Sequence, residues 1–285
     1  MSTEQQILNL IRKITPGSRK HLHDDAAIVE TNLIVTTDTL VENTHFTLKS
    51  YTPYEIGWKA LAVNLSDIAA MGSKPLYALV SLSLPKSTSL WWIRELYKSI
   101  NNCAKKYKTQ IIGGNLTRSK EVNITITLIG KLISSKIGKR SNAKPGDVVF
   151  ATGTFGNAVK KPIPQIELGQ KIVRACLKHA PALMDSSDGL ADCLIQIANE
   201  SKVKITVEEL KIPVLKKIPT NLALYGGEDY QLVGTVSKID WEKLKKIKRI
   251  KIIGEVVKGK GAYLKQSNRK LVKLDMKKGF SHFKK

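Results

Sequence analysis

Hydrophobic and polar positions follow two periods in turn along the chain, and this alternation predicts an α/β (α+β) protein. Apolar residues at helical spacing predict helices over residues 1–13, 53–71, 89–107, 168–179 and 190–201. Apolar and β-branched runs predict strands over residues 26–29, 33–37, 76–84, 110–112, 122–133, 148–152, 203–207, 230–236 and 250–256. Gly72 and Pro75 follow the second helix as a conventional stop signal.

The pattern changes in the middle of the chain. Residues 134–146 are polar and basic, and they end in the run Ala143-Lys144-Pro145-Gly146-Asp147. A chain of 285 residues is long enough for two compact domains. We therefore expect an N-terminal α/β domain over residues 1–139 and a C-terminal α/β domain over residues 140–285.

Charge is the most unusual feature of the composition. The 47 Lys and Arg residues exceed the 24 Asp and Glu residues, which gives a formal net charge of +23 and raises a nucleic-acid hypothesis. No helix-turn-helix, zinc-finger or aromatic-rich RNA-binding pattern accompanies the charge. Most of the lysines fit the solvated faces of helices and strands, so a Lys-rich surface is the favoured interpretation. Such a surface also attracts anionic substrates.

The remaining composition indicates an ordinary cytoplasmic protein. No stretch resembles a signal peptide, and no apolar run approaches the ~20 residues that span a bilayer. Cys103, Cys176 and Cys193 have neither disulfide nor zinc spacing. We expect no membrane association and a reducing compartment.

The acidic residues are few, and several lie where an apolar segment meets a turn or a small residue. Each has an alternative role as a helix cap, a turn residue or a solvated side chain. Together they suit magnesium, which prefers carboxylate oxygens drawn from separate segments. The residues are Asp24, Asp25, Asp38, Asp67, Asp185, Asp188, Glu228 and Asp229.

Two glycine pairs add a possible phosphate site. Gly113-Gly114 follows the expected strand over residues 110–112, and Gly226-Gly227 precedes the strand that begins near residue 230. Glycine lets backbone amides approach a phosphate closely, although two tight turns explain the pairs equally well. Neither pair forms a Walker A loop or a dinucleotide fingerprint. His45, taken alone, is more simply a structural histidine.

Longer motifs resemble those of the thiamine-monophosphate kinases, in order along nearly the whole chain. They are TTDTLVENTHF over residues 36–46, KALAVNLSDIAAMG over 59–72, IIGGN over 111–115, KRSNAKPGD over 139–147, DSSDGL over 185–190, GGEDY over 226–230 and GFSHF over 279–283. Departures from the family pattern include His23 before Asp24, Asn43 before Thr44 and His45, Asn115 where Asp also occurs, and Ser281 for Asp.

The resemblance implies a fold, a reaction and an assembly. The fold is that of the aminoimidazole-ribotide-synthetase-like ATP-binding superfamily, with N-terminal domains that pair in a homodimer and complete a shared barrel. The reaction converts thiamine monophosphate and ATP to thiamine diphosphate and ADP. Because the acceptor is already an ionised phosphate, we expect direct transfer assisted by several Mg²⁺ ions, without a protein nucleophile.

The resemblance also implies roles for individual residues. The implied metal ligands are Asp25, Thr37, Asp38, Asp67, Asn115, Asp185 and Asp188. The implied ATP contacts are Tyr97, Gly114, Asn115, Arg140 and Ser187. The implied contacts to thiamine phosphate are His45, Glu228 and Phe280.

Two alternatives stay open. The first is another enzyme of the same superfamily with a different acceptor. Selenophosphate synthetase fits poorly, since its reactive residue lies near the N-terminus and the first cysteine here is Cys103. The second is a basic nucleic-acid-binding relative that has lost the activity. It predicts salt-sensitive binding to DNA or RNA without ATP turnover.

Overall fold

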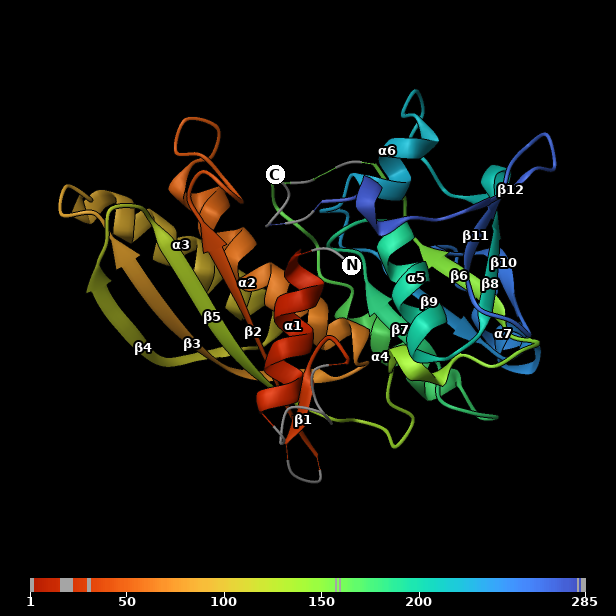
Figure 1. The fold of residues 1–285 in the computed structure, drawn as a ribbon. Coiled ribbons are helices and arrows are strands. Elements are labelled where there is room, and N and C mark those ends of the chain that lie inside the picture. The colour runs from red at the N-terminus through yellow and green to blue at the C-terminus, as the bar shows by residue number, and fades with distance from the viewer. Residues whose placement is uncertain are drawn as a thin grey trace.

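The computed structural model describes residues 3–15, 23–29, 32–156, 158, 160–280 and 282. Figure 1 shows two parts side by side, each built on one sheet. The helices are α1 (Thr3–Ile14), α2 (Pro53–Ala70), α3 (Leu90–Tyr107), α4 (Ile166–Ala175), α5 (Leu190–Glu200), α6 (Thr220–Tyr225) and α7 (Lys238–Leu244). No helix within these residues is long and apolar enough to cross a membrane.

The first sheet has the strand order β1-β2-β5-β3-β4. Its strands are β1 (Ala27–Val29), β2 (Leu33–Val41), β3 (Lys74–Leu84), β4 (Gln110–Arg118) and β5 (Asn123–Lys131). Buried and less buried residues alternate along β2, β3 and β5, because α2 and α3 cover only one face. The other face is open among the described residues.

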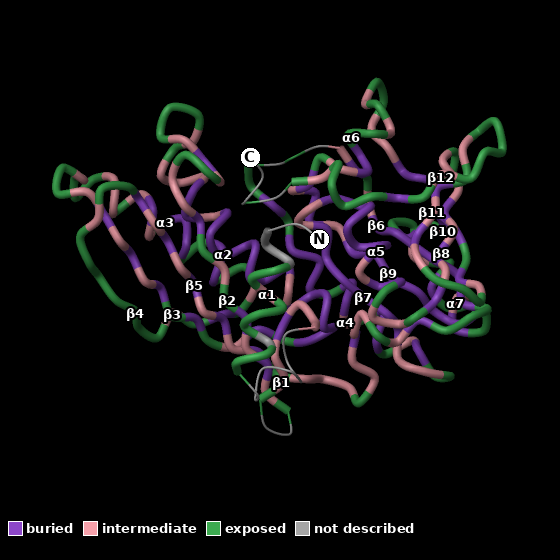
Figure 2. The backbone as a smooth tube through the Cα atoms, viewed as in Figure 1, coloured by how far each residue is buried: buried purple, intermediate pink, exposed green. Residues whose placement is uncertain are grey.

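The second sheet has the strand order β12-β11-β8-β10-β6-β9-β7. Its strands are β6 (Val148–Thr152), β7 (Ala182–Asp185), β8 (Lys204–Glu208), β9 (Leu232–Val236), β10 (Ile250–Val257), β11 (Gly261–Lys265) and β12 (Leu271–Lys273). β6, β7 and β9 are buried along their whole length, which Figure 2 shows in purple, whereas β4 of the first sheet is largely exposed.

Helix α2 joins the two parts. It begins with a capping box, in which Thr52 accepts from the Glu55 amide and Glu55 accepts from the Thr52 amide. It contacts α3, β2 and β5 on one side, and α4 and β7 on the other. One hydrophobic cluster includes Leu65 of α2, Phe150 of β6 and Ile172 of α4. The first sheet ends at residue 131 and the second begins at residue 148, while the division at residues 139 and 140 remains a prediction.

The elements differ from the sequence prediction in several places. β2 continues through Asp38 to Val41, so Asp38 lies within the strand and not at its end. β4 was predicted as a short buried strand, but it continues through Gly113-Gly114 to Arg118 and is an exposed edge strand. The predicted basic tail contains the paired strands β11 and β12. β7, α6 and α7 were not predicted, because each is too short to show a clear period.

Candidate active site

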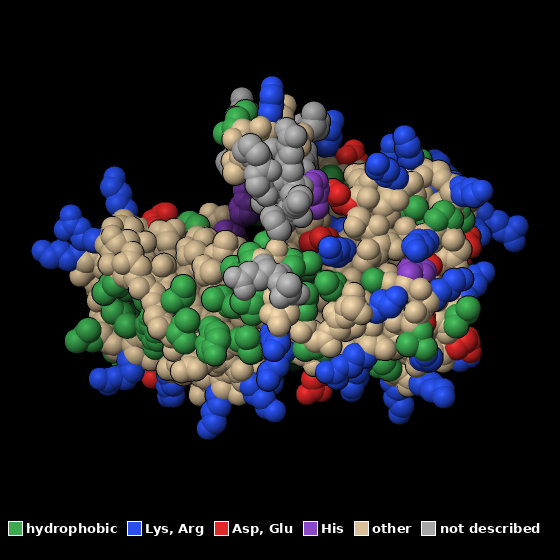
Figure 3. Space-filling model, turned by 90° about the horizontal axis from the view of Figure 1, so that it is seen from below, with side chains coloured by type: hydrophobic (Ala, Val, Ile, Leu, Met, Phe, Trp, Pro, Cys, Tyr) green, Lys and Arg blue, Asp and Glu red, His purple; other side chains and the backbone are tan. Residues whose placement is uncertain are grey.

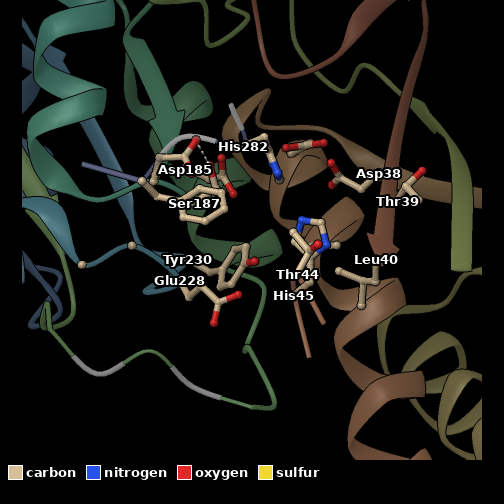
Figure 4. A pocket seen from close by; sticks show the side chains of 16 residues that line it. Asp38, Thr39, Leu40, Thr44, His45, Asp185, Ser187, Glu228, Tyr230 and His282 are labelled. Carbon is tan, nitrogen blue, oxygen red and sulfur yellow. Dashed lines mark hydrogen bonds between the residues drawn. The ribbon is translucent and has the colours of Figure 1, made fainter. Parts of the chain in front are cut away.

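A cavity of about 340 Å³ lies between the two parts. Its walls come from β2, from α2, from the segment after β7, from the turn before β9 and from the C-terminal segment. Figure 4 shows Asp38 and His45 from the first part, and Asp185, Ser187 and Glu228 from the second part, around the same cavity. Residues from distant parts of the chain therefore meet at one place.

Three buried or half-buried carboxylates form one cluster at this junction. Asp25 precedes β1, Asp67 lies on α2 and Asp185 ends β7, and one oxygen of each lies within 4.8 Å of the others. Thr36 donates its hydroxyl to Oδ2 of Asp67 at 2.5 Å. Oδ2 of Asp25 is buried and has no hydrogen-bond partner among the described residues. The cluster thus holds more acceptor oxygens than the surrounding donors satisfy.

Burial and mutual repulsion shift the protonation of these groups. Burial raises the pKa of Asp67 and that of Asp185 well above the usual range, and neighbouring carboxylates raise both further. Burial also raises the pKa of Asp38 to about 6, with a contribution from Asp188. Such a concentration of carboxyl groups favours a bound cation, which would stabilise their ionised forms.

Arg140 lies against the acidic cluster. Its Nη2 donates to Asp25 Oδ1, its Nη1 donates to Gln196, and its backbone amide donates to Asp24 Oδ1 at 2.9 Å. Arg140 was predicted to contact ATP. In this structure its guanidinium is paired with Asp25, and Asp24 fixes the backbone of the connecting segment.

The three predicted substrate contacts all line the cavity. Nδ1 of His45 accepts from the Val41 amide at 2.9 Å, so this nitrogen carries no proton. Burial lowers the pKa of His45, and the neighbouring His282 and Lys59 lower it further. The His282 ring centroid lies 5.1 Å from that of His45 and 4.8 Å from that of Phe280. A neutral imidazole and two further rings therefore border one side of the cavity.

Apart from the paired Asp25 and Arg140, four further predicted residues do not line this cavity. The Thr37 hydroxyl contacts Ile126 and Thr127 on the open face of the first sheet. Tyr97 lies on α3 and packs against the hydrophobic core. The other two are Gly114 and Asn115 of β4.

The sheet register places these β4 residues far from the acidic cluster. Asp38 pairs with Ile126, Ile126 with Val80, and Val80 with Gly114. Three strand spacings of about 4.8 Å separate Asp38 from Gly114, or roughly 14 Å. One ion cannot be bound by Asp38 and Asn115 of the same chain at this separation, because magnesium–oxygen distances are about 2 Å.

Four site residues were missed by the sequence analysis. Thr36 lies on the same face of β2 as Asp38, which the period of two along the strand could have shown. Lys59 directly precedes the apolar run Ala60–Val63 in a mostly apolar helix, and a lysine in such a place is itself a signal. His282 lies in the terminal motif, whose Ser281 and Phe283 are outside the described residues. Burial raises the pKa of Asp192 to about 7, and Asp188 adds to the shift, but no sequence signal marks it.

Comparison with known proteins gives a consistent result. Residues 23–132 match the family described as AIR synthase related protein, N-terminal domain. The chain is 36% identical to thiamine-monophosphate kinase of Bacillus subtilis, over 97% of this chain and 99% of that protein. It is 33% identical to the enzyme of Aquifex aeolicus, over 90% of this chain and 92% of that protein.

Solved structures agree with the sequence comparison. The AaThiL structure complexed with AMPPCP and TMP is similar with a TM-score of 0.82 and 32% identity, covering 90% of this chain and 92% of that one. The HypE–HypF complex is similar with a TM-score of 0.81 at 23% identity, covering 94% of this chain and 98% of that one. The second likeness shows the fold alone.

Proposed function

The chain belongs to the thiamine-monophosphate kinase family, and we propose that it transfers the γ-phosphoryl group of ATP directly to thiamine monophosphate in the cavity between its two parts. The products are thiamine diphosphate and ADP. The observation that carries the proposal is the meeting of two unlike surfaces in one cavity. Buried carboxylates lie on one side, and His45, Glu228 and Phe280 lie on the other.

The acidic side suits magnesium. Asp25, Asp67 and Asp185 offer hard oxygen ligands within reach of one ion, and the unsatisfied Oδ2 of Asp25 needs a partner. Asp38 and Asp188 border the same cavity and complete the proposed ligand set. Magnesium bound there would neutralise negative charge on the phosphates of both substrates. The described residues thus fit the ion, which is proposed as a cofactor with ATP as co-substrate.

The acceptor side suits a cationic ring system. Thiamine carries a permanently charged thiazolium, so a carboxylate at Glu228 attracts it while a neutral His45 does not repel it. Phe280 is 49% exposed and offers a free ring face for stacking. This side of the cavity therefore supports selection of the thiamine moiety.

The transfer itself needs position more than a protein base. An ionised oxygen of the acceptor phosphate attacks the γ-phosphorus, and the bond from that phosphorus to the bridging oxygen of ADP breaks. The acceptor oxygen carries no proton at neutral pH, so none has to be removed. The chain's own residues align two anions and exclude water, which accounts for many aspartates and no assigned nucleophile.

A homodimer would explain three of the predicted residues that lie outside the cavity. Thr37, Gly114 and Asn115 lie on or beside the open face of the first sheet, whose exposed side chains include Tyr77 and Leu79. Figure 3 shows hydrophobic side chains gathered on the left part of the molecule, with Lys and Arg around the rim. We place this face against the same face of a second copy, where the two sheets complete a shared barrel. Thr37, Gly114 and Asn115 then reach the nucleotide at the subunit boundary. Tyr97 lies on α3 at the covered face, so this pairing does not account for its predicted contact with ATP.

The stereochemical course tests direct transfer. ATP made chiral at the γ-phosphorus with oxygen isotopes should yield thiamine diphosphate with inverted configuration, because a single in-line displacement inverts the centre. Retention would indicate two displacements through a phosphoenzyme and would overturn the proposal.

We place the reaction in the cytoplasm, where ATP is supplied.

A further inference from the structure

Lys59 is the one lysine of α2, a helix that is buried along most of its length. Its side chain is fully buried (0% exposed) on α2. Its Nζ donates to Oε1 of Glu228 at 2.5 Å and to the backbone oxygen of His45 at 3.0 Å. The ring centroid of Tyr51 lies 5.3 Å from the same nitrogen. One ammonium thus contacts residues from both parts of the chain at the acceptor side of the cavity.

The two residues that it contacts belong to different parts of the chain. His45 lies just after β2 in the first part, whereas Glu228 lies before β9 in the second. Both line the cavity. The hydrogen bonds of Lys59 connect the side chain of Glu228 with the backbone of His45. Their relative position therefore depends on this lysine.

The backbone at Glu228 needs such support. Glu228 has a φ of 58° and follows Gly227 with a φ of 71°, so this non-glycine residue is in the left-handed region. Its amide donates to the Ser187 oxygen at 2.6 Å. A strained backbone persists where the surroundings hold it from several sides. Lys59 holds the side chain while Ser187 holds the main chain.

Stability alone does not explain a lysine at this place. Removing an ammonium from water costs much of what the ion pair returns, and a well-packed apolar residue of similar length stabilises a core at least as well. Every neighbouring position of α2 from Ala60 to Leu65 is buried, and only Asn64 among them is polar. The charge at position 59 therefore points to a role in the site.

We propose that Lys59 is a positioning residue for the acceptor. It fixes Oε1 of Glu228 and so leaves Oε2, which has no hydrogen-bond partner among the described residues, for the cationic thiamine moiety. It also fixes the backbone of His45, whose ring borders the same space. The inference rests on the proposed function, because it takes Glu228 and His45 as acceptor contacts.

Steady-state kinetics of Lys59→Met tests the role. Methionine keeps the length of the side chain and removes the charge. The KM for thiamine monophosphate should rise about 10-fold or more, as expected when a charged hydrogen bond no longer orients a contact group, while the KM for ATP stays within about twofold. Lys98→Met is the matched control on α3, since its side chain is 60% exposed, and it should leave both constants unchanged.

A double variant separates positioning from simple docking of the two parts. Lys59→Met combined with Glu228→Gln should raise the KM for thiamine monophosphate no further than the worse single variant. The reason is that both changes remove the same interaction, the pair between Lys59 and Glu228. The double variant removes both charges of the buried pair and leaves neither unpaired. The inference therefore remains testable if Lys59→Met alone does not fold. Additive effects, equal rises in both KM values, or no change in either would overturn the inference.

A binding measurement tests the role of Lys59 without requiring that the protein be a kinase. If the wild-type protein formed no thiamine diphosphate, the proposed function would fail, and calorimetric binding of thiamine monophosphate to the same variants would still measure the positioning. Unchanged affinity in Lys59→Met would then overturn the inference alone. A loss of affinity of about 10-fold or more in that variant would support it.

Discussion

At the scale of single residues, the site is built from carboxyl groups that the fold buries away from water. Asp38 lies on β2 within the cavity, and burial together with Asp188 and Asp25 raises its pKa to about 6. Its backbone amide donates to Asn64 Oδ1 at 3.1 Å, so α2 fixes its position. A carboxylate that is costly to ionise, and yet is held rigidly, is suited to binding a cation.

Replacing Asp38 by Asn should abolish most of the turnover. The change removes one proposed ligand while the size of the side chain hardly changes, so kcat should fall at least about 100-fold, beyond the loss typical of a group that only supports a ligand. The thermal transition should stay close to that of the wild type. Glu242→Gln is a suitable control, because its side chain is 63% exposed on α7. Near-normal turnover in Asp38→Asn would remove Asp38 from the site.

Replacing Phe280 by Ala should weaken the acceptor more than the nucleotide. Phe280 contacts His282 edge to face and borders the acceptor side of the cavity. Loss of its stacking surface should raise the KM for thiamine monophosphate by about 3- to 10-fold, consistent with about 0.5–1.5 kcal/mol for an aromatic contact. Initial rates at varied acceptor and varied ATP distinguish the two constants. An equal rise in both would contradict this role.

The motifs named residues that the structure brings together, but they did not show which way each side chain points. The carboxylates at 25, 38, 67, 185 and 188 were named from motifs, and the structure brings them to the same junction. Thr37 was named and stays a prediction, whereas Thr36, which was not named, donates to Asp67, because the resemblance fixes a motif but not the face of a strand. Lys59 was quoted within a motif and given no role, since its partner Glu228 is distant in sequence and only the tertiary fold reveals the pair.

At the scale of elements, α2 is the centre of the molecule. Its first turn is fixed by the capping box, and its sides pack on the first sheet, on α3 and on α4. The closest approach to α4 is made possible by Gly169. A Cβ atom at this position would lie 2.0 Å from the backbone oxygen of Ala69. The contact between the two parts thus depends on a missing side chain.

Replacing Gly169 by Ala should therefore destabilise the fold. Alanine is favoured over glycine in a helix by up to about 1 kcal/mol, but the clash with backbone atoms of α2 cannot relax cheaply. The free energy of unfolding should fall by about 1–3 kcal/mol in denaturant titrations. Lys171→Ala on the exposed side of α4 should change it by no more than about 0.5 kcal/mol. Unchanged stability of Gly169→Ala would show that α4 does not dock as described.

The long elements were predictable and the short ones were not. The helices α2, α3 and α5 lie within two residues of their predicted bounds, because each shows several turns of the helical period. β4 was predicted as buried because of its apolar start, but the pairing order puts it at an edge, and pairing order is a property of the whole sheet. β7 has four residues, too few to distinguish a strand from a loop in sequence.

At the scale of the whole molecule, two surfaces require explanation by a partner or an ion. The cavity collects carboxylates that repel one another, and the first sheet leaves one face open. A single chain without ligands neither offsets the repulsion among the carboxylates nor covers the open face. Bound metal would offset the first, and a second copy of the chain would cover the second.

A charge on the open face should prevent dimer formation. Leu79 lies on β3 and is 37% exposed, so Leu79→Lys should change the folded chain little while placing a cation in the proposed interface. Light scattering after size-exclusion chromatography should find a dimer for the wild type and a monomer for the variant, with reduced turnover. Leu90→Lys, at an 81% exposed position at the start of α3, should remain dimeric. A monomeric wild type or a dimeric Leu79→Lys would contradict the proposed assembly.

Magnesium should stabilise the protein more at neutral than at acidic pH. Burial raises the pKa of Asp38 to about 6 and that of Asp192 to about 7, above the usual value near 3.9, so the folded state binds more protons than the unfolded one. Their contribution to stability is present below about pH 4 and is lost as the pH rises through about 6 to 7. Cation binding at the ionised cluster offsets that loss.

The difference in Tm with and without millimolar Mg²⁺ measures this effect at each pH. It should be about 5 °C or more near pH 7.5 and much smaller near pH 5. Because groups elsewhere titrate equally in both samples, their contributions cancel in the difference. An equal gain at the two pH values, or none at either, would contradict metal binding by the carboxylate cluster.

The most direct test of the central claim is a single assay with ATP and Mg²⁺ in which ADP and thiamine diphosphate are both quantified. Thiamine monophosphate, free thiamine and no acceptor are supplied in parallel. We predict equal amounts of ADP and thiamine diphosphate with the monophosphate, and neither product above background in the other two samples. ADP release without thiamine diphosphate would contradict the acceptor assignment, and no turnover by the folded protein would contradict the kinase.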